Sequence, residues 1–151
     1  MIAVDQALSA RPHGQARDAY TGRRQESARA KARVLLIEDD DAVATLFVTL
    51  LSEEGYAVER VAHQNDALAI FAARGPRAVD LVLTVPFGRP LDAPYAWLDR
   101  LKARTRAPIA ICARVPAVLY ADHRIRGYAA YLEEPFDIRD LLDLVDDLCA
   151  P

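Results

Sequence analysis

The chain has 151 residues, of which 52% are hydrophobic and 27% are charged, a balance that suits one globular domain with a substantial core. It contains no run of 18 apolar residues and no basic N-terminal stretch followed by a long apolar segment, so we expect a cytoplasmic protein with no membrane partner. Cys112 and Cys149 lie far apart and form no C-x-x-C motif, which favours buried free thiols over a zinc or redox site.

Charge is unevenly distributed along the sequence, although the net charge is only −3. Residues 1–33 carry seven basic and three acidic groups, whereas residues 34–151 carry 12 basic and 19 acidic groups. The first segment also has few large apolar side chains, too few to offset the entropy lost on ordering. We therefore expect residues 1–31 to form a basic, largely disordered leader and residues 32–151 to form the folded domain.

Strand and helix patterns alternate from residue 33 onwards. Residues 34–37 form a continuous apolar run, which is typical of a strand buried on both faces. The expected elements, in chain order, are strand 34–37, a helix from Asp41 to Gly55, strand 56–61, helix 67–73, strand 78–85, helix 95–104, strand 108–112, a weaker helix over 116–126, strand 129–132 and helix 136–149. Asp41 or Asp40 is expected to cap the first helix, and Asn65 or Asp66 the second.

Five strands that alternate with five helices predict an α/β fold with a doubly wound parallel sheet covered on both faces. Functional sites in such folds lie beyond the carboxyl ends of the strands. The residues of interest are therefore those that directly follow each predicted strand.

Six short segments in this order carry a resemblance to a known family. They are 34–40 (VLLIEDD), 54–58 (EGYAV), 80–84 (DLVLT), 91–92 (LD), 108–111 (PIAI) and 131–137 (YLEEPFD). Together they resemble the receiver domain of two-component response regulators, over residues 32–150. The resemblance implies a flavodoxin- or CheY-like (βα)5 fold with strand order 2-1-3-4-5.

Receiver domains phosphorylate themselves with a small set of residues. An acidic pair and a phosphoacceptor aspartate hold Mg²⁺, while a lysine and a threonine or serine stabilise the phosphoryl oxygens. The resemblance assigns Glu38 and Asp39 to the acidic pair, Val85 to the acceptor, Ala113 to the hydroxyl position and Glu134 to the lysine. Valine has no oxygen to phosphorylate, so the resemblance implies a degenerate receiver.

The altered pocket leads to further expectations. Cys112 would take the hydroxyl position if the loop were one residue shorter, and it is not a threonine or serine either. We expect no cofactor and no metal, and we keep a residual cation at the acidic pair as the minor alternative. Because Glu134 would lie near other carboxylates, we predict that Arg114 or Arg89 forms an ion pair with it.

The leading hypothesis is a stand-alone, non-enzymatic receiver module that acts by protein–protein interaction without aspartyl phosphorylation. Its partner would be a histidine kinase, another response regulator or an output protein, or a second copy of the chain. The resemblance implies a partner face built from the fourth helix, the fifth strand and the fifth helix. The aromatic residues expected there are Tyr120, Tyr128, Tyr131 and Phe136.

Two alternatives remain open from the residues alone. In the first, the domain accepts a phosphoryl group on an unconventional carboxylate, Asp92 or Asp40. In the second, the protein associates with nucleic acid through its basic leader, although that leader lacks the interleaved aromatic residues of a nucleic-acid reader.

Overall fold

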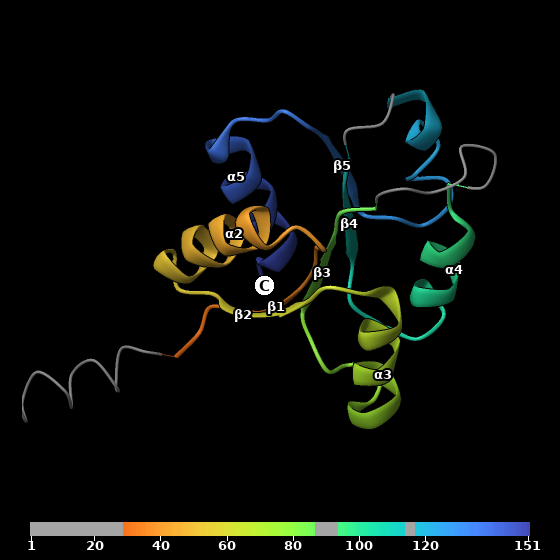
Figure 1. The fold of residues 1–151 in the computed structure, drawn as a ribbon, viewed down its shortest axis with the longest axis horizontal. Coiled ribbons are helices and arrows are strands. Elements are labelled where there is room, and N and C mark those ends of the chain that lie inside the picture. Colours follow the sequence, from red (N-terminus) through yellow and green to blue (C-terminus); the bar gives the residue numbers. More distant parts are fainter. Residues whose placement is uncertain (1–28, 87–93, 114–116) are drawn as a thin grey trace, which may run out of the picture. The chain divides into compact units, whose positions relative to one another are not determined.

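The computed structural model describes residues 29–86, 94–113 and 117–151, with the main chain alone described at residues 117 and 118. Helices and strands alternate along these residues (Figure 1). The strands are β1 Arg33–Ile37, β2 Ala57–Val61, β3 Leu81–Thr84, β4 Ile109–Ala113 and β5 Ala130–Glu133. The helices are α2 Asp41–Glu53, α3 Gln64–Arg74, α4 Ala96–Lys102 and α5 Ile138–Cys149, with a 3₁₀ helix, η1, at Ala117–Tyr120.

The five strands form one parallel sheet in the order β2-β1-β3-β4-β5, as predicted. Strand β1 lies between β2 and β3, so Val34 pairs with both Val58 and Leu81. Strands β3 and β4 are buried along their whole length. Their unbroken apolar sequences follow from this position, because helices cover both faces of the sheet.

Helices α2 and α5 cover one face of the sheet, and α3 and α4 cover the other (Figure 1). Alternate residues of β1 point into the two resulting cores: Leu35 and Ile37 pack with the α3 and α4 residues, whereas Val34 and Leu36 pack with those of α2 and α5. Strand β1 therefore contributes side chains to both cores, because successive residues of a strand point to opposite faces of the sheet.

The predicted helix over 116–126 is wrong beyond its first turn. After the 3₁₀ turn η1, residues 121–127 form hydrogen-bonded turns, including bonds from the His123 amide to the Tyr120 carbonyl and from the Tyr128 amide to the His123 carbonyl. Tyr120 and Tyr128 are both buried against Tyr95, and this packing holds the segment close to the sheet. The described residues therefore contain four α-helices, not the five of a (βα)5 count.

The structure decides between the two caps predicted for α2 and corrects the one predicted for α3. Asp40, not Asp41, caps α2, and its Oδ1 accepts a hydrogen bond of 3.0 Å from the Val43 amide. Helix α3 follows His63 without a side-chain cap, so neither Asn65 nor Asp66 has that role. Helix α5 begins two residues later than predicted and is capped by Asp137, which accepts from the Arg139 amide at 2.9 Å.

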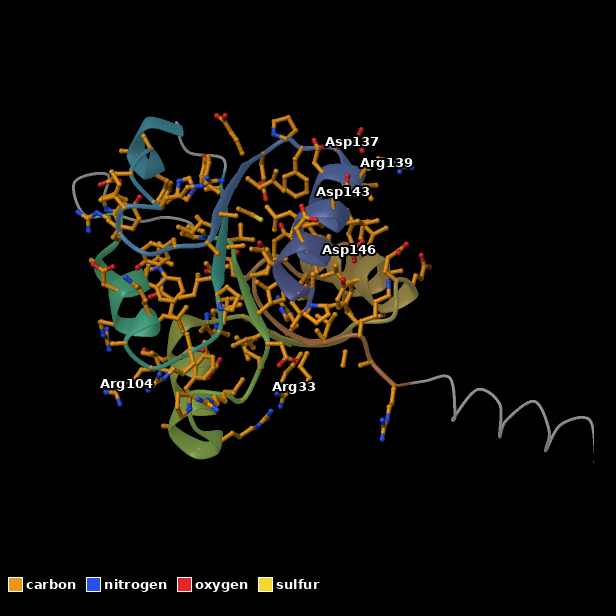
Figure 2. All side chains as sticks on the ribbon, turned by 180° about the vertical axis from the view of Figure 1, so that it is seen from behind. Arg33, Arg104, Asp137, Arg139, Asp143 and Asp146 are labelled. Atoms are coloured by element: carbon orange, nitrogen blue, oxygen red, sulfur yellow. The ribbon has the colours of Figure 1, made fainter. Side chains whose placement is uncertain are left out.

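The exposed side of α5 is acidic. Figure 2 shows Asp137, Asp143 and Asp146 along this helix, and the last of these accepts a hydrogen bond from the Tyr56 hydroxyl. Within the described ranges, no helix is both long enough and apolar enough to cross a bilayer.

Candidate functional site at the carboxyl edge of the sheet

Main-chain hydrogen bonds gather the candidate residues at the carboxyl edge of the sheet. The Val85 amide donates to the Ile37 carbonyl at 3.0 Å, and the Glu134 amide donates to the Ala113 carbonyl at 2.9 Å. The Glu38 amide in turn donates to the Val61 carbonyl at 3.1 Å. The structure therefore places Ala113 at the end of β4, and Glu38, Val85 and Glu134 just beyond the ends of β1, β3 and β5.

Val85 continues the hydrophobic core beyond the end of β3. Its side chain is 8% exposed and belongs to the core beneath α2 and α5, together with Leu83 and Cys112. The hydroxyl of the preceding Thr84 is buried and has no hydrogen-bond partner in the described part of the chain. The end of this strand is thus apolar, and it offers neither a nucleophile nor a metal ligand at position 85.

Glu38 is a buried carboxylic acid at the end of β1. It is 3% exposed, and its Oε1 accepts a hydrogen bond of 2.9 Å from the Asp40 amide. Its Oε2 is buried without a hydrogen-bond partner among the described residues. Burial raises the pKa of Glu38 to about 7, with the nearby carboxylates of Asp39 and Glu134 adding to the rise and the Asp40 amide opposing it. Near neutral pH, Glu38 therefore exchanges between its protonated and charged forms.

Arg60 provides the cation on the β2 side of this edge, and the sequence reading missed it. Its Nε donates to the Glu38 carbonyl at 2.9 Å, and its Nη1 lies 2.9 Å from Asp41 Oδ1. It reaches this position because Arg60 pairs with Leu36 in the register of β1 and β2. The signal for it in the sequence is a basic residue near the end of the second predicted strand, which would lie beside the acidic loop after the first strand. The Arg60 side chain therefore connects the sheet to the main chain of that loop.

Ala113 and Cys112 close the floor of the site from β4. Both are fully buried, and Cys112 is a free thiol. Burial raises the pKa of the Cys112 thiol well above its ordinary value, and the nearby carboxylates of Glu134 and Glu38 raise it further. Neither side chain supplies a hydroxyl donor for a phosphoryl oxygen.

Glu134 is half-buried and follows β5 directly, with a cis peptide bond to Pro135. Its predicted ion-pair partners, Arg89 and Arg114, lie outside the described residues, as does Asp92. Those predictions stay predictions.

The described residues at this edge do not supply the Mg²⁺ ligands that the resemblance implies. Such an ion needs several oxygen ligands in near-octahedral geometry, and the valine side chain at position 85 supplies none. Asp39 is exposed on the loop, while Glu38 lies inside. Across residues 29–86, 94–113 and 117–151, no three His, Cys, Asp or Glu side chains are grouped to hold a metal ion.

Two of the four aromatic residues expected at a partner face are instead core residues. Tyr120 and Tyr128 are each 2% exposed. The Tyr128 hydroxyl donates to Asp99 at 2.6 Å, and the ring of Tyr120 stacks on Tyr131 with a centroid distance of 5.6 Å. In this conformation neither buried ring is available to a partner. The reason is their packing with Tyr95, which no local pattern reveals.

An apolar groove lies beside the cis proline, between α2 and the start of α5. It has a volume of about 450 Å³, and Phe136 lines it opposite Phe47, at a ring centroid distance of 5.8 Å. Leu46 and Ile138 also line it and are 50% and 46% exposed. Large exposed apolar side chains around one groove are typical of a protein-binding surface.

The chain matches no protein-family model. Among known proteins, it is similar to YvcP, an uncharacterized transcriptional regulatory protein of Bacillus subtilis (strain 168), with 32% identity over 107 residues. That match covers 70% of this chain and 44% of YvcP, so the chain spans less than half the length of this relative.

Solved structures share the sheet and its covering helices. A response regulator receiver protein from Burkholderia phymatum superposes with a TM-score of 0.66 at 19% identity, over 78% of this chain and 94% of that one. A CheY-like receiver domain from Methylobacillus flagellatus gives 0.61 at 24% identity, over 77% and 97%. This is the fold of response-regulator receiver domains. The strand order expected from the resemblance is confirmed, and the receiver fold extends over the described domain.

Proposed function

We propose that this chain is a receiver module of a two-component signalling system that acts by binding protein partners and accepts no aspartyl phosphate. The receiver fold supports the class of module. One observation supports this mode of action above all. Val85, which is 8% exposed and has no oxygen in its side chain, occupies the strand end where the resemblance expects the phosphoacceptor. An isolated valine methyl group can form no bond to phosphorus.

The charges at the edge support the same conclusion. An incoming phosphoryl group would approach the carboxylates of Glu38, Asp39 and Glu134, which repel its negative charge. Receivers counter that charge with a metal ion and a lysine, and here Glu134 stands at the lysine position. The residue at the lysine position therefore carries a charge opposite to the one that a receiver uses to bind a phosphoryl group.

The partner is a protein of the same signalling class: a histidine kinase, another response regulator, an output protein or a second copy of this chain. On the face formed by residues 117–127, β5 and α5, the half-buried rings of Tyr131 and Phe136 remain as aromatic contacts. The apolar groove that Phe136 shares with Leu46 and Ile138 extends the candidate surface towards α2.

The test is incubation of the full chain with acetyl phosphate and Mg²⁺, followed by intact-mass measurement, with a phosphorylatable receiver labelled in parallel. We expect no added phosphoryl mass on this chain. A phosphoserine ester, which survives acid, or a phosphoramidate of lysine or histidine, which survives mild alkali, would not bear on the aspartyl question. The adduct is therefore also checked for stability in acid and in mild alkali. An adduct that is lost under both conditions, as an acyl phosphate is, contradicts the proposal.

Two variants identify the acceptor if such an adduct forms. Asp40→Asn retains the helix cap but removes the carboxylate, and Asp92→Asn removes the second candidate. Loss of labelling in either variant would establish the unconventional-acceptor alternative. The nucleic-acid alternative predicts binding that weakens steeply with salt and disappears when residues 1–31 are deleted.

A further inference from the structure

Four basic residues line a cleft at the amino-terminal end of the sheet, opposite the edge that carries Glu38. The cleft has a volume of about 590 Å³ and is lined by Lys31, Arg33, Arg77 and Arg106. Asp80 is the single acidic side chain among the described residues that line it. The lining residues therefore carry a surplus of three positive charges. By contrast, residues 34–151 as a whole carry more acidic than basic groups, 19 against 12.

Hydrogen bonds between loops bring these cations together. The Arg106 amide and the Thr105 hydroxyl donate to the Pro76 carbonyl at 2.8 and 3.3 Å, which joins the loops that follow α3 and α4. Arg33 Nη2 donates to the Arg77 carbonyl at 3.3 Å, which joins the start of β1 to the same loop. The cluster is thus built from three chain segments that the fold holds side by side.

The charge of Arg33 is already balanced within the cleft. Asp80 Oδ1 lies 3.2 Å from Arg33 Nη2, and Asp80 Oδ2 accepts from the Arg33 amide at 2.8 Å. By contrast, no ion pair engages Arg77 or Arg106 in the described part of the chain. Both side chains are exposed, so their guanidinium groups are available to an anion that enters the cleft.

The walls between the cations are apolar. Val79 is 5% exposed, and Pro108 and Leu148 continue the same lining. Small-molecule sites commonly measure about 300–1,000 Å³ and combine apolar walls with a few polar groups, and this cleft falls within that range. Guanidinium groups match phosphate oxygens in charge and in geometry, since each can donate two parallel hydrogen bonds.

We propose that this cleft binds a phosphate-bearing small molecule of nucleotide size, with Arg77 and Arg106 contacting the phosphates and Val79 and Leu148 contacting the apolar body. This inference is independent of the proposed function, because the cleft and the altered phosphorylation pocket lie at opposite ends of the strands.

The test is calorimetric titration of the full chain with magnesium-free ATP at low ionic strength. We expect saturable binding that weakens at least tenfold in the Arg77→Gln/Arg106→Gln double variant. The matched control is Arg104→Gln, which removes the same charge from a side chain that lines a different cleft, between α3 and α4. Figure 2 shows Arg104 well separated from Arg33 at this end of the domain. The control should bind ATP as the unmodified chain does.

Competing ligands identify the part of ATP that is recognised. Pyrophosphate should displace ATP, adenosine alone should not, and binding should weaken with salt because the cations are exposed. The proposal is overturned if ATP shows no saturable binding at concentrations up to about 1 mM, which corresponds to a binding free energy of about −4 kcal/mol. It is equally overturned if the double variant retains full affinity, or if Arg104→Gln loses as much. Thermal melts of all variants establish that each remains folded.

Discussion

Glu38 is the residue whose ionisation should most affect stability near neutral pH. Its carboxyl group is 3% exposed and accepts a hydrogen bond at one oxygen only. In an unfolded chain this group would ionise with a pKa near 4.5, whereas burial raises its pKa in the folded domain to about 7. The folded state therefore binds the proton more tightly than the unfolded state does.

The sign of the pH dependence follows from this difference. Between about pH 4.5 and pH 7 the folded domain holds a proton that the unfolded chain has lost, so the contribution of Glu38 to stability falls as pH rises through this window. A pKa difference of this size corresponds to roughly 3 kcal/mol across the window.

The Glu38→Gln variant tests this expectation, because glutamine can still accept from the Asp40 amide but carries no charge. We expect the variant to be more stable than the unmodified chain at pH 8, by about 1–3 kcal/mol, and to differ much less at pH 5. Urea unfolding at both pH values measures the difference. A variant that is destabilised equally at both would show that ionisation of Glu38 is not the cause.

At the scale of elements, the loop between β1 and α2 is held from two sides. Asp40 caps α2 by accepting from the Val43 amide, and Arg60 binds the Glu38 carbonyl from β2. Asp41, by contrast, meets Arg60 in an ion pair in which the Asp41 side chain is 90% exposed. The cap is therefore the stronger local interaction, since exposed ion pairs contribute little.

Substitutions at the two aspartates should separate the cap from the ion pair. Asp40→Ala should lower the free energy of unfolding by about 1 kcal/mol, the usual effect of losing an N-cap, while Asp41→Ala should have a smaller effect. Asp40→Asn is the matched control, because it removes the charge and keeps a capping oxygen. Denaturant unfolding of the three variants provides the comparison. A larger loss for Asp41→Ala would contradict the assignment of the cap to Asp40.

The connection between β4 and β5 shows how an element can depend on distant residues. A helix over 116–126 was a reasonable expectation from the sequence, but the segment must also bury Tyr120 and Tyr128 against Tyr95. Arg126 lies over the ring of Tyr95, at 4.3 Å from the ring centroid, and its Nε donates to Asp122 at 3.1 Å. The turns at residues 121–127 allow all of these contacts to form.

At the scale of the whole molecule, charge is separated between the two ends of the sheet. The carboxyl edge carries Glu38, Asp39 and Glu134, while the amino-terminal end carries the cleft with its surplus of cations. The two cores between these ends are apolar, and both include side chains from the strands. The fold thus offers two chemically distinct surfaces joined by a rigid sheet.

Cys112 provides a probe of this sheet. It is fully buried in β4, and burial raises the pKa of its thiol, so it should resist thiol reagents in the folded state. In a Cys149→Ser variant, we expect labelling of Cys112 only at denaturant concentrations that unfold the domain. The reciprocal Cys112→Ala variant, which retains the half-buried Cys149, should label faster. Rapid native-state labelling of Cys112 would show that β4 opens locally.

Much of the receiver fold and part of its altered edge could be predicted from the sequence. The apolar runs of β1, β3 and β4 predicted a covered parallel sheet because local patterns report burial on both faces. The strand ends then placed Glu38 and Val85 at one edge, since the carboxyl ends of parallel strands meet there. That position 85 lacks an oxygen is a fact of the sequence alone.

Other features were decided by tertiary structure. The raised pKa of Glu38, the reach of Arg60 to its carbonyl and the burial of Tyr120 all depend on groups far apart in the chain. The basic residues of the cleft likewise come from three separate segments of the chain. No local pattern encodes these contacts, because each one arises from the register of the sheet and from the packing of helices against it.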